Sequence, residues 1–133
     1  MSPGNRVRAV GATIRSVEFD RFTAVLLILN PDGPKLSEDE ENALQDAHMA
    51  HLADLHDAGH LLAAGPLADL PDRHFRGLSI LNVDAETALE LKSSDPAVKV
   101  GKFVLKAIPW MVPAGAIHYS HTRFPRSVAD ARD

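Results

Sequence analysis

The stretch Phe22-Thr-Ala-Val-Leu-Leu-Ile-Leu29 is aliphatic and β-branched without interruption, and it ends at Asn30-Pro31-Asp32-Gly33-Pro34. Such a run, bounded by turn residues, is typical of a β-strand followed by a loop. Residues 24–29 are apolar at both odd and even positions, and residues 61–64 further along share this pattern. Strands that are apolar on both sides predict a sheet with both faces buried.

Helix and strand patterns alternate after this first strand. Ser37 and Glu40 form a capping-box pattern at the start of a long helix, and Gly59 supplies the residue that ends it. Asp84 is a typical cap for a second, shorter helix. The expected elements are a strand at 22–29, a helix at 37–58, strands at 60–67 and 75–83, a helix at 84–91 and a strand at 103–112.

This order predicts an α+β fold, a ferredoxin-like βαββαβ unit with a four-stranded antiparallel sheet and both helices on one face. Two helices cover only one face of the sheet, whereas the strands are apolar on both sides and therefore predict that both faces are buried. A second subunit would cover the other face, so we expect an obligate homodimer with an α/β barrel between the protomers. The domain is expected at 22–112, between an N-terminal extension (1–21) and a C-terminal tail (113–133) without assigned functions; the alternating residues 13–19 could add an edge strand.

Composition excludes several classes of function. The chain has 133 residues, of which 45% are hydrophobic and 24% charged, as expected for one compact domain. A net charge of −4 and only 5% aromatic residues argue against nucleic-acid binding. The chain has no cysteine, which removes disulfides and thiolate nucleophiles. No apolar run is long enough to cross a membrane, so we expect no membrane partner and a cytoplasmic protein.

His48 interrupts the apolar stripe of the long helix. At about 100° per residue it lies about 40° from Leu44, between Leu55 and Leu52, where a leucine would be usual. An inward imidazole without a hydrogen-bond partner costs on the order of 1–3 kcal/mol. Asp95 is the candidate partner. A carboxylate against one ring nitrogen fixes the tautomer and favours the protonated ring, which suits a general base near neutral pH.

Simpler structural interpretations stay open for the same residues. His48 could be a core histidine whose hydrogen bonds are satisfied. Asp95 with Pro96 is also a typical helix start, and a capping role is compatible with holding an imidazole. Trp110 fits core or dimer packing better than a stacking platform.

The remaining histidines have weaker claims to a site. His51 shares the inward stripe and follows His48 at a His-x-x-His spacing, which His118 and His121 repeat. Neither of these two pairs has a nearby carboxylate in a recognised metal-binding order. The sequence therefore favours no metal and no cofactor. His56 and His60 fall at the end of the long helix, where cationic side chains are stabilising, and both are expected on the surface.

Several motifs, taken in order, resemble those of a known family. They are His48-Met-Ala-His51-Leu-Ala-Asp-Leu55-His-Asp-Ala-Gly59-His-Leu-Leu-Ala-Ala-Gly65-Pro66, Asp84-Ala-Glu-Thr-Ala88, Asp95-Pro96 and Ile108-Pro109-Trp110. Over roughly residues 22–112 the chain resembles the YCII-related (YciI-like) family. The resemblance implies a dimeric ferredoxin-like α/β barrel and an active-site cleft with a His-Asp pair, which carries over to His48 and Asp95. It also implies lyase-like chemistry, such as dehydrochlorination of hydroxylated aromatic rings, in a superfamily that includes muconolactone isomerases and monooxygenases.

We therefore expect a small enzyme without a cofactor, in which His48 transfers a proton and Asp95 orients it. The reaction would be of lyase or isomerase type on a small cyclic or aromatic substrate, because no cysteine or credible serine nucleophile favours covalent catalysis. The alternatives are a non-catalytic dimer that binds a small ligand and a structural dimer without a ligand. Substrate-binding residues are expected at His51, Gly65, Pro66 and Ser79.

Overall fold

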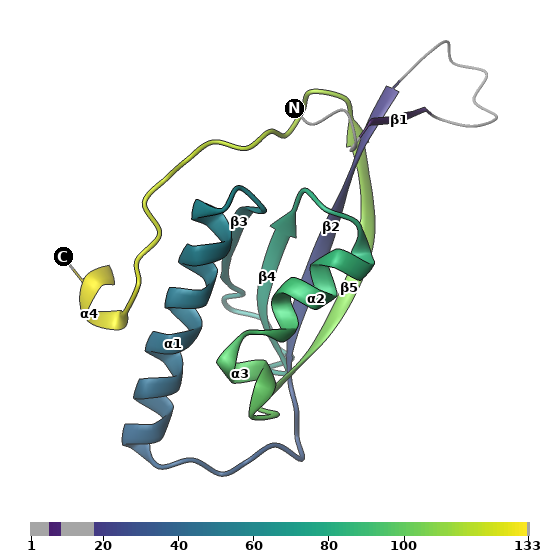
Figure 1. The fold of residues 1–133 in the computed structure, drawn as a ribbon. Coiled ribbons are helices and arrows are strands. Elements are labelled where there is room, and N and C mark those ends of the chain that lie inside the picture. The colour runs from purple at the N-terminus through teal and green to yellow at the C-terminus, as the bar shows by residue number, and fades with distance from the viewer. Residues whose placement is uncertain (1–5, 9–17, 133) are drawn as a thin grey trace.

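A computed structural model describes residues 6–8 and 18–132 of the chain (Figure 1). Its elements follow the expected strand and helix order, with short additions at both ends and a short helix, α3, between the second helix and the last strand. In chain order they are β1 (Arg6–Arg8), β2 (Glu18–Leu29), α1 (Glu38–Asp57), β3 (Leu61–Pro66), β4 (Phe75–Leu81), α2 (Ala85–Ser93), α3 (Pro96–Lys99), β5 (Phe103–Pro113) and α4 (Val128–Ala131).

All strand pairs are antiparallel, and the four main strands lie in the order β5-β2-β4-β3. This is the ferredoxin-like α+β arrangement that the sequence predicts. The first strand begins at Glu18 rather than at Phe22, and its early part pairs with β1 as a fifth strand. Of the alternating segment 13–19, residues 18 and 19 belong to β2, and residues 13–17 lie outside the described residues.

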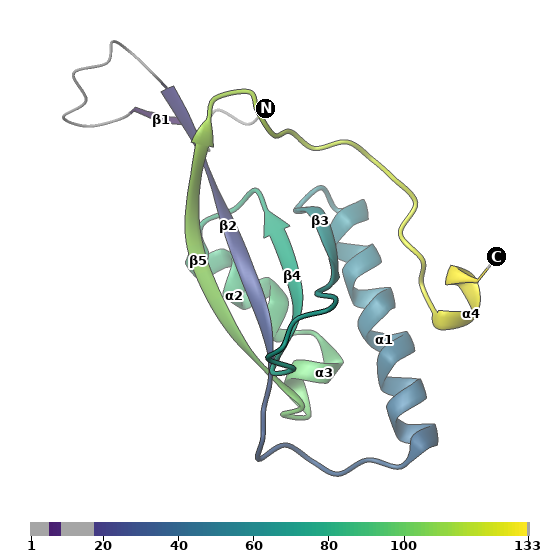
Figure 2. The ribbon, with the colours of Figure 1, turned by 180° about the vertical axis from the view of Figure 1, so that it is seen from behind.

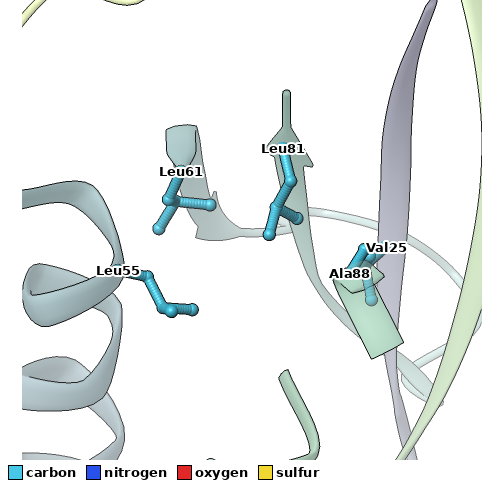
Figure 3. Close-up of a cluster of buried hydrophobic side chains, with 5 residues drawn as sticks. All are labelled: Val25, Leu55, Leu61, Leu81 and Ala88. Carbon is cyan, nitrogen blue, oxygen red and sulfur yellow. The ribbon is translucent and has the colours of Figure 1, made fainter. Parts of the chain in front are cut away.

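The helices α1, α2 and α3 all cover the same face of the sheet, and the view from behind shows the opposite face without a helix (Figures 1 and 2). The core between the layers contains one buried side chain from each of five elements (Figure 3). They are Val25 of β2, Leu55 of α1, Leu61 of β3, Leu81 of β4 and Ala88 of α2. The apolar stripe of α1 therefore packs against the inward side chains of the strands, as the sequence predicts.

Helix α1 is fixed at both ends by local interactions. The Ser37 hydroxyl accepts a hydrogen bond from the Glu40 amide at 3.2 Å, and the Glu40 carboxylate accepts one from the Ser37 amide at 3.0 Å. Gly59 follows the helix with φ of +88°, a left-handed conformation that favours glycine. These caps confirm the predicted helix and fix the axial position of the histidines that it carries.

The C-terminal tail runs from the end of β5 along the outer side of α1 (Figures 1 and 2). His56 holds it there, and the prediction that His56 lies on the surface is wrong, because its side chain is fully buried. Its Nδ1 donates to the Leu61 carbonyl at 2.6 Å, and its Nε2 accepts from the Thr122 amide at 2.9 Å. His60 is half-buried and not exposed as expected. The tail, which lies far away in sequence, supplies the partners that helix position alone could not predict.

Replacing Phe124 by alanine should loosen the tail. The Phe124 ring stacks on His56 with centroids 4.1 Å apart and packs against the core cluster. Its loss should lower the free energy of unfolding by about 1–3 kcal/mol in urea titrations and speed trypsin cleavage at Arg123 and Arg126. Ser120→Ala, at an exposed tail position, is the control. Unchanged stability and proteolysis in Phe124→Ala would show that the tail is not anchored by this ring.

Candidate active site

A cavity of about 430 Å³ lies between α1 and the helix-facing side of the sheet. Helix α1 contributes His48, Met49 and Leu52 to its wall, and strands β3 and β4 form the facing side. Phe124 and Pro125 of the tail close one side. The tail thus takes part in the site, one of the two roles considered for it from the sequence, the other being an extension of the dimer interface.

His48 of this wall meets Asp95, which does not itself line the cavity. The Nδ1 atom of His48 lies 2.5 Å from Oδ2 of Asp95, and the carboxylate is fully buried. The two residues are 47 positions apart in the sequence. The structure therefore gives the inward His48 the hydrogen-bond partner expected from the sequence, Asp95.

The contact fixes which nitrogen of the ring faces the cavity. An ionised carboxylate only accepts hydrogen bonds, so Nδ1 carries the hydrogen and Nε2 of the neutral ring is an acceptor. Among the described residues, Nε2 of His48 makes no hydrogen bond. This atom is also not fully buried, because every fully buried side-chain nitrogen and oxygen of the described residues has a partner. His48 therefore presents a free basic nitrogen to whatever occupies the cavity.

Asp95 performs two tasks with its two oxygens. While Oδ2 contacts His48, Oδ1 accepts the Ala97 amide at 2.9 Å and caps α3, with Pro96 at the first helical position. Burial alone would raise the pKa of Asp95, but His48, the Ala97 amide and the charge of Lys92 together lower it below the usual range for aspartate. The carboxylate thus stays ionised, and the capping and pairing interpretations are both correct.

His51 does not line the cavity with His48. Its Nε2 lies 3.1 Å from the Leu91 carbonyl, between α1 and the end of α2. Burial lowers the pKa of His51, and the positive charges of Lys92 and His48 add to this, against the opposing effects of Asp95 and the Leu91 carbonyl. His51 was expected to bind substrate, but it contacts the Leu91 carbonyl and is not among the residues that line the cavity.

The other expected binding residues do line the cavity. Gly65 and Pro66 lie at the end of β3, and Ser79 is 5% exposed on β4. The sequence reasoning missed Lys92, which is 2% exposed and donates from Nζ to the Ser79 hydroxyl at 3.2 Å. Its spacing of four residues from Ala88, which is fully buried, is the signal that could have placed it on the inner face of α2.

Acidification should destabilise the protein through these groups. His51 has a folded pKa below its usual value, so the unfolded chain binds the proton first, and stability falls as the pH drops below about 6.5. Asp95 adds a further loss below about pH 3.9, because its folded pKa is also lowered. In urea unfolding at about pH 7.5 and about pH 5, His51→Gln should lose less stability than the wild type. The exposed His118→Gln should match the wild type, and an equal loss in all three proteins would contradict this assignment.

Within residues 6–8 and 18–132, no group of three or more histidine, aspartate or glutamate side chains is arranged to hold a metal ion. His118 is exposed, and His121 lies 3.2 Å from Asp57 on the protein surface. In the same residues, no helix combines the length and the apolar character that crossing a membrane requires.

Comparison with known proteins agrees with the fold and with the motifs. The family model of the YCII-related domain matches residues 24–111, close to the expected 22–112. No curated protein matches the chain. The match covers well over half of the chain. It includes His48 and its partner Asp95. By this match the chain belongs to the family of YCII-related domain proteins.

Proposed function

We propose that this protein is an enzyme that transfers a proton without a cofactor, through His48 and Asp95, in a small cyclic or aromatic substrate. The observation that carries the proposal is the 2.5 Å contact between Asp95 and His48, a histidine that lines a cavity of about 430 Å³. A buried carboxylate behind an imidazole with a free Nε2 is the arrangement that a general base needs.

The proposed reaction begins at an acidic C–H bond of the substrate. The Nε2 atom of His48 takes the proton, and the electron pair of that bond moves into an adjacent carbonyl or ring as an enolate. Returning the proton to another carbon completes an isomerisation. Expelling a leaving group from the neighbouring carbon completes an elimination, after which His48 releases its proton to water. Asp95 stabilises the imidazolium that forms between the two steps.

A homodimer is the second part of the proposal. Side chains that alternate with the buried Val25 of β2 point to the sheet face opposite the helices, and their partners on β4 and β5 share that face. This open sheet face contains the apolar residues Ala24, Leu26, Ile28, Leu78, Ile80, Val104, Ile108 and Trp110, together with Lys106, the register partner of Leu26. An apolar sheet face of this kind supports pairing with a second copy through a shared barrel. A cytoplasmic location stays a prediction from the sequence.

Proton abstraction can be tested without knowing the product. A panel of cyclic and aromatic compounds with acidic C–H bonds is incubated in D₂O, and loss of the C–H signal is followed by NMR. We expect exchange at one class of compound with the wild type and none above background with His48→Gln. Ligand-induced shifts without exchange would instead support the non-catalytic binding module, and exchange that survives in His48→Gln would overturn the proposed role of His48.

A further inference from the structure

Lys92 is a buried lysine on the wall of the same cavity, where burial lowers the pKa of its ammonium group and the negative charge of Asp95 opposes this shift. It lies at the inner face of α2, is 2% exposed, and donates one hydrogen bond to Ser79 at 3.2 Å. An ammonium group has three N–H donors. In the part of the chain that the structure describes, the other two have no partner, and no carboxylate forms a salt bridge with Lys92. A buried charge in this state leaves unused hydrogen-bonding capacity beside the cavity.

Ser79 adds a second donor at the same place. Its oxygen accepts the hydrogen bond from Lys92, so its own O–H remains available to donate. Among the described residues no acceptor for that hydrogen is present. Two neighbouring, buried donors, one of them charged, match the two oxygens of a carboxylate.

The remaining wall supports an anion with an apolar body. Arg73, Arg76 and Lys102 also line the cavity, whereas no aspartate or glutamate of the described chain does so. Lys102 is paired with Glu41. The chain as a whole has a net charge of −4, so this positive wall is a local feature. Apolar residues from α1 and from all four main strands, among them Met49, Leu27 and Phe103, form much of the rest of the cavity.

We propose that the ligand of this cavity is a small carboxylate with a cyclic apolar body, and that Lys92 and Ser79 bind its carboxylate group. This deepens the proposed function by naming the substrate class, and it rests on that function only for the claim that the ligand reacts. His48 lines the same cavity as Lys92 and Ser79, so one ligand can contact both the proposed anion subsite and the histidine. A substrate held there by its carboxylate would present its ring to His48.

Benzoate and its neutral isostere benzamide test the charge preference directly. Both are titrated into the ¹⁵N-labelled wild-type protein, and amide shifts of the cavity residues give the dissociation constants. We expect benzoate to bind with a Kd of about 1–10 mM and at least about tenfold more tightly than benzamide. Equal affinities, or no cavity shifts with benzoate, would overturn the proposal.

Lys92→Met should remove the preference for benzoate, and Ser79→Ala, a smaller change that keeps the fold, should weaken benzoate binding about threefold or more. Lys99→Met is the control, because Lys99 is exposed on α3 and does not line the cavity. Retention of the full preference in Ser79→Ala and Lys92→Met would overturn the assignment. His48→Gln separates the two proposals: benzoate binding should survive it, whereas C–H exchange should not.

Discussion

Asp95→Asn should lower the rate of proton transfer by about 10²–10⁴-fold without removing the cap of α3. The asparagine oxygen can still accept the Ala97 amide, as Oδ1 of Asp95 does at 2.9 Å. Its NH₂ group, however, would donate to Nδ1 of His48, where the carboxylate accepts. The ring hydrogen then moves to Nε2, so the nitrogen that faces the cavity changes from an acceptor to a donor and no longer abstracts a proton.

The tautomer change is measurable apart from the rate. Long-range ¹H–¹⁵N spectra of the histidine rings should show the hydrogen of His48 on Nδ1 in the wild type and on Nε2 in Asp95→Asn. Asp84→Asn is a matched control, because Asp84 caps α2 by the same kind of bond to Thr87 and does not line the cavity. If Asp95→Asn kept the wild-type tautomer and the wild-type rate, the pair would be a structural contact only.

Ile108→Asp should convert the proposed dimer into a monomer. Ile108 lies on the open sheet face, and two-fold symmetry would place two new carboxylates in one interface. Burying unpaired carboxylates costs several kcal/mol, which raises the dissociation constant by about 10²-fold or more. The side chain is 38% exposed in the single chain, so the monomer itself should still fold.

Leu89→Asp is the control for this experiment, because Leu89 is equally exposed, at 38%, but lies on α2. Light scattering at micromolar concentration should give twice the chain mass for the wild type and for Leu89→Asp, and the single mass for Ile108→Asp. Trp110, the only tryptophan, lies on the same face, so its emission should shift to the red in the monomer. A monomeric wild type at micromolar concentration would contradict the dimer.

The fold could be predicted from the sequence because its signals are local. The capping box at Ser37, the glycine after α1 and the apolar run in β2 each act within a few residues. The start of β2 was placed late, because residues 18–21 include charged side chains that hide their pairing with β1 and β5. Pairing partners that are remote in sequence therefore limit the precision of strand ends.

The need of His48 for a partner was predictable because an inward imidazole requires a hydrogen bond, and the resemblance to the YCII-related family supported Asp95 as that partner. His56 was misplaced because its partners come from the tail, which has no periodicity that would predict contact with α1. Lys92 was missed because the short helix was expected to end at Leu91, one residue before it. Residues whose partners are local or chemically obligatory are predictable, whereas those held by irregular segments are not.

The double task of Asp95 affects how the evolution of this position can be interpreted. A change to alanine removes a helix cap together with the partner of His48, so selection for stability alone would retain a capping residue there. Asparagine caps as well as aspartate does, yet it reverses the ring hydrogen of His48. Under the proposed function, the choice between aspartate and asparagine at this position in relatives of this chain would report selection for proton transfer, separately from selection for folding.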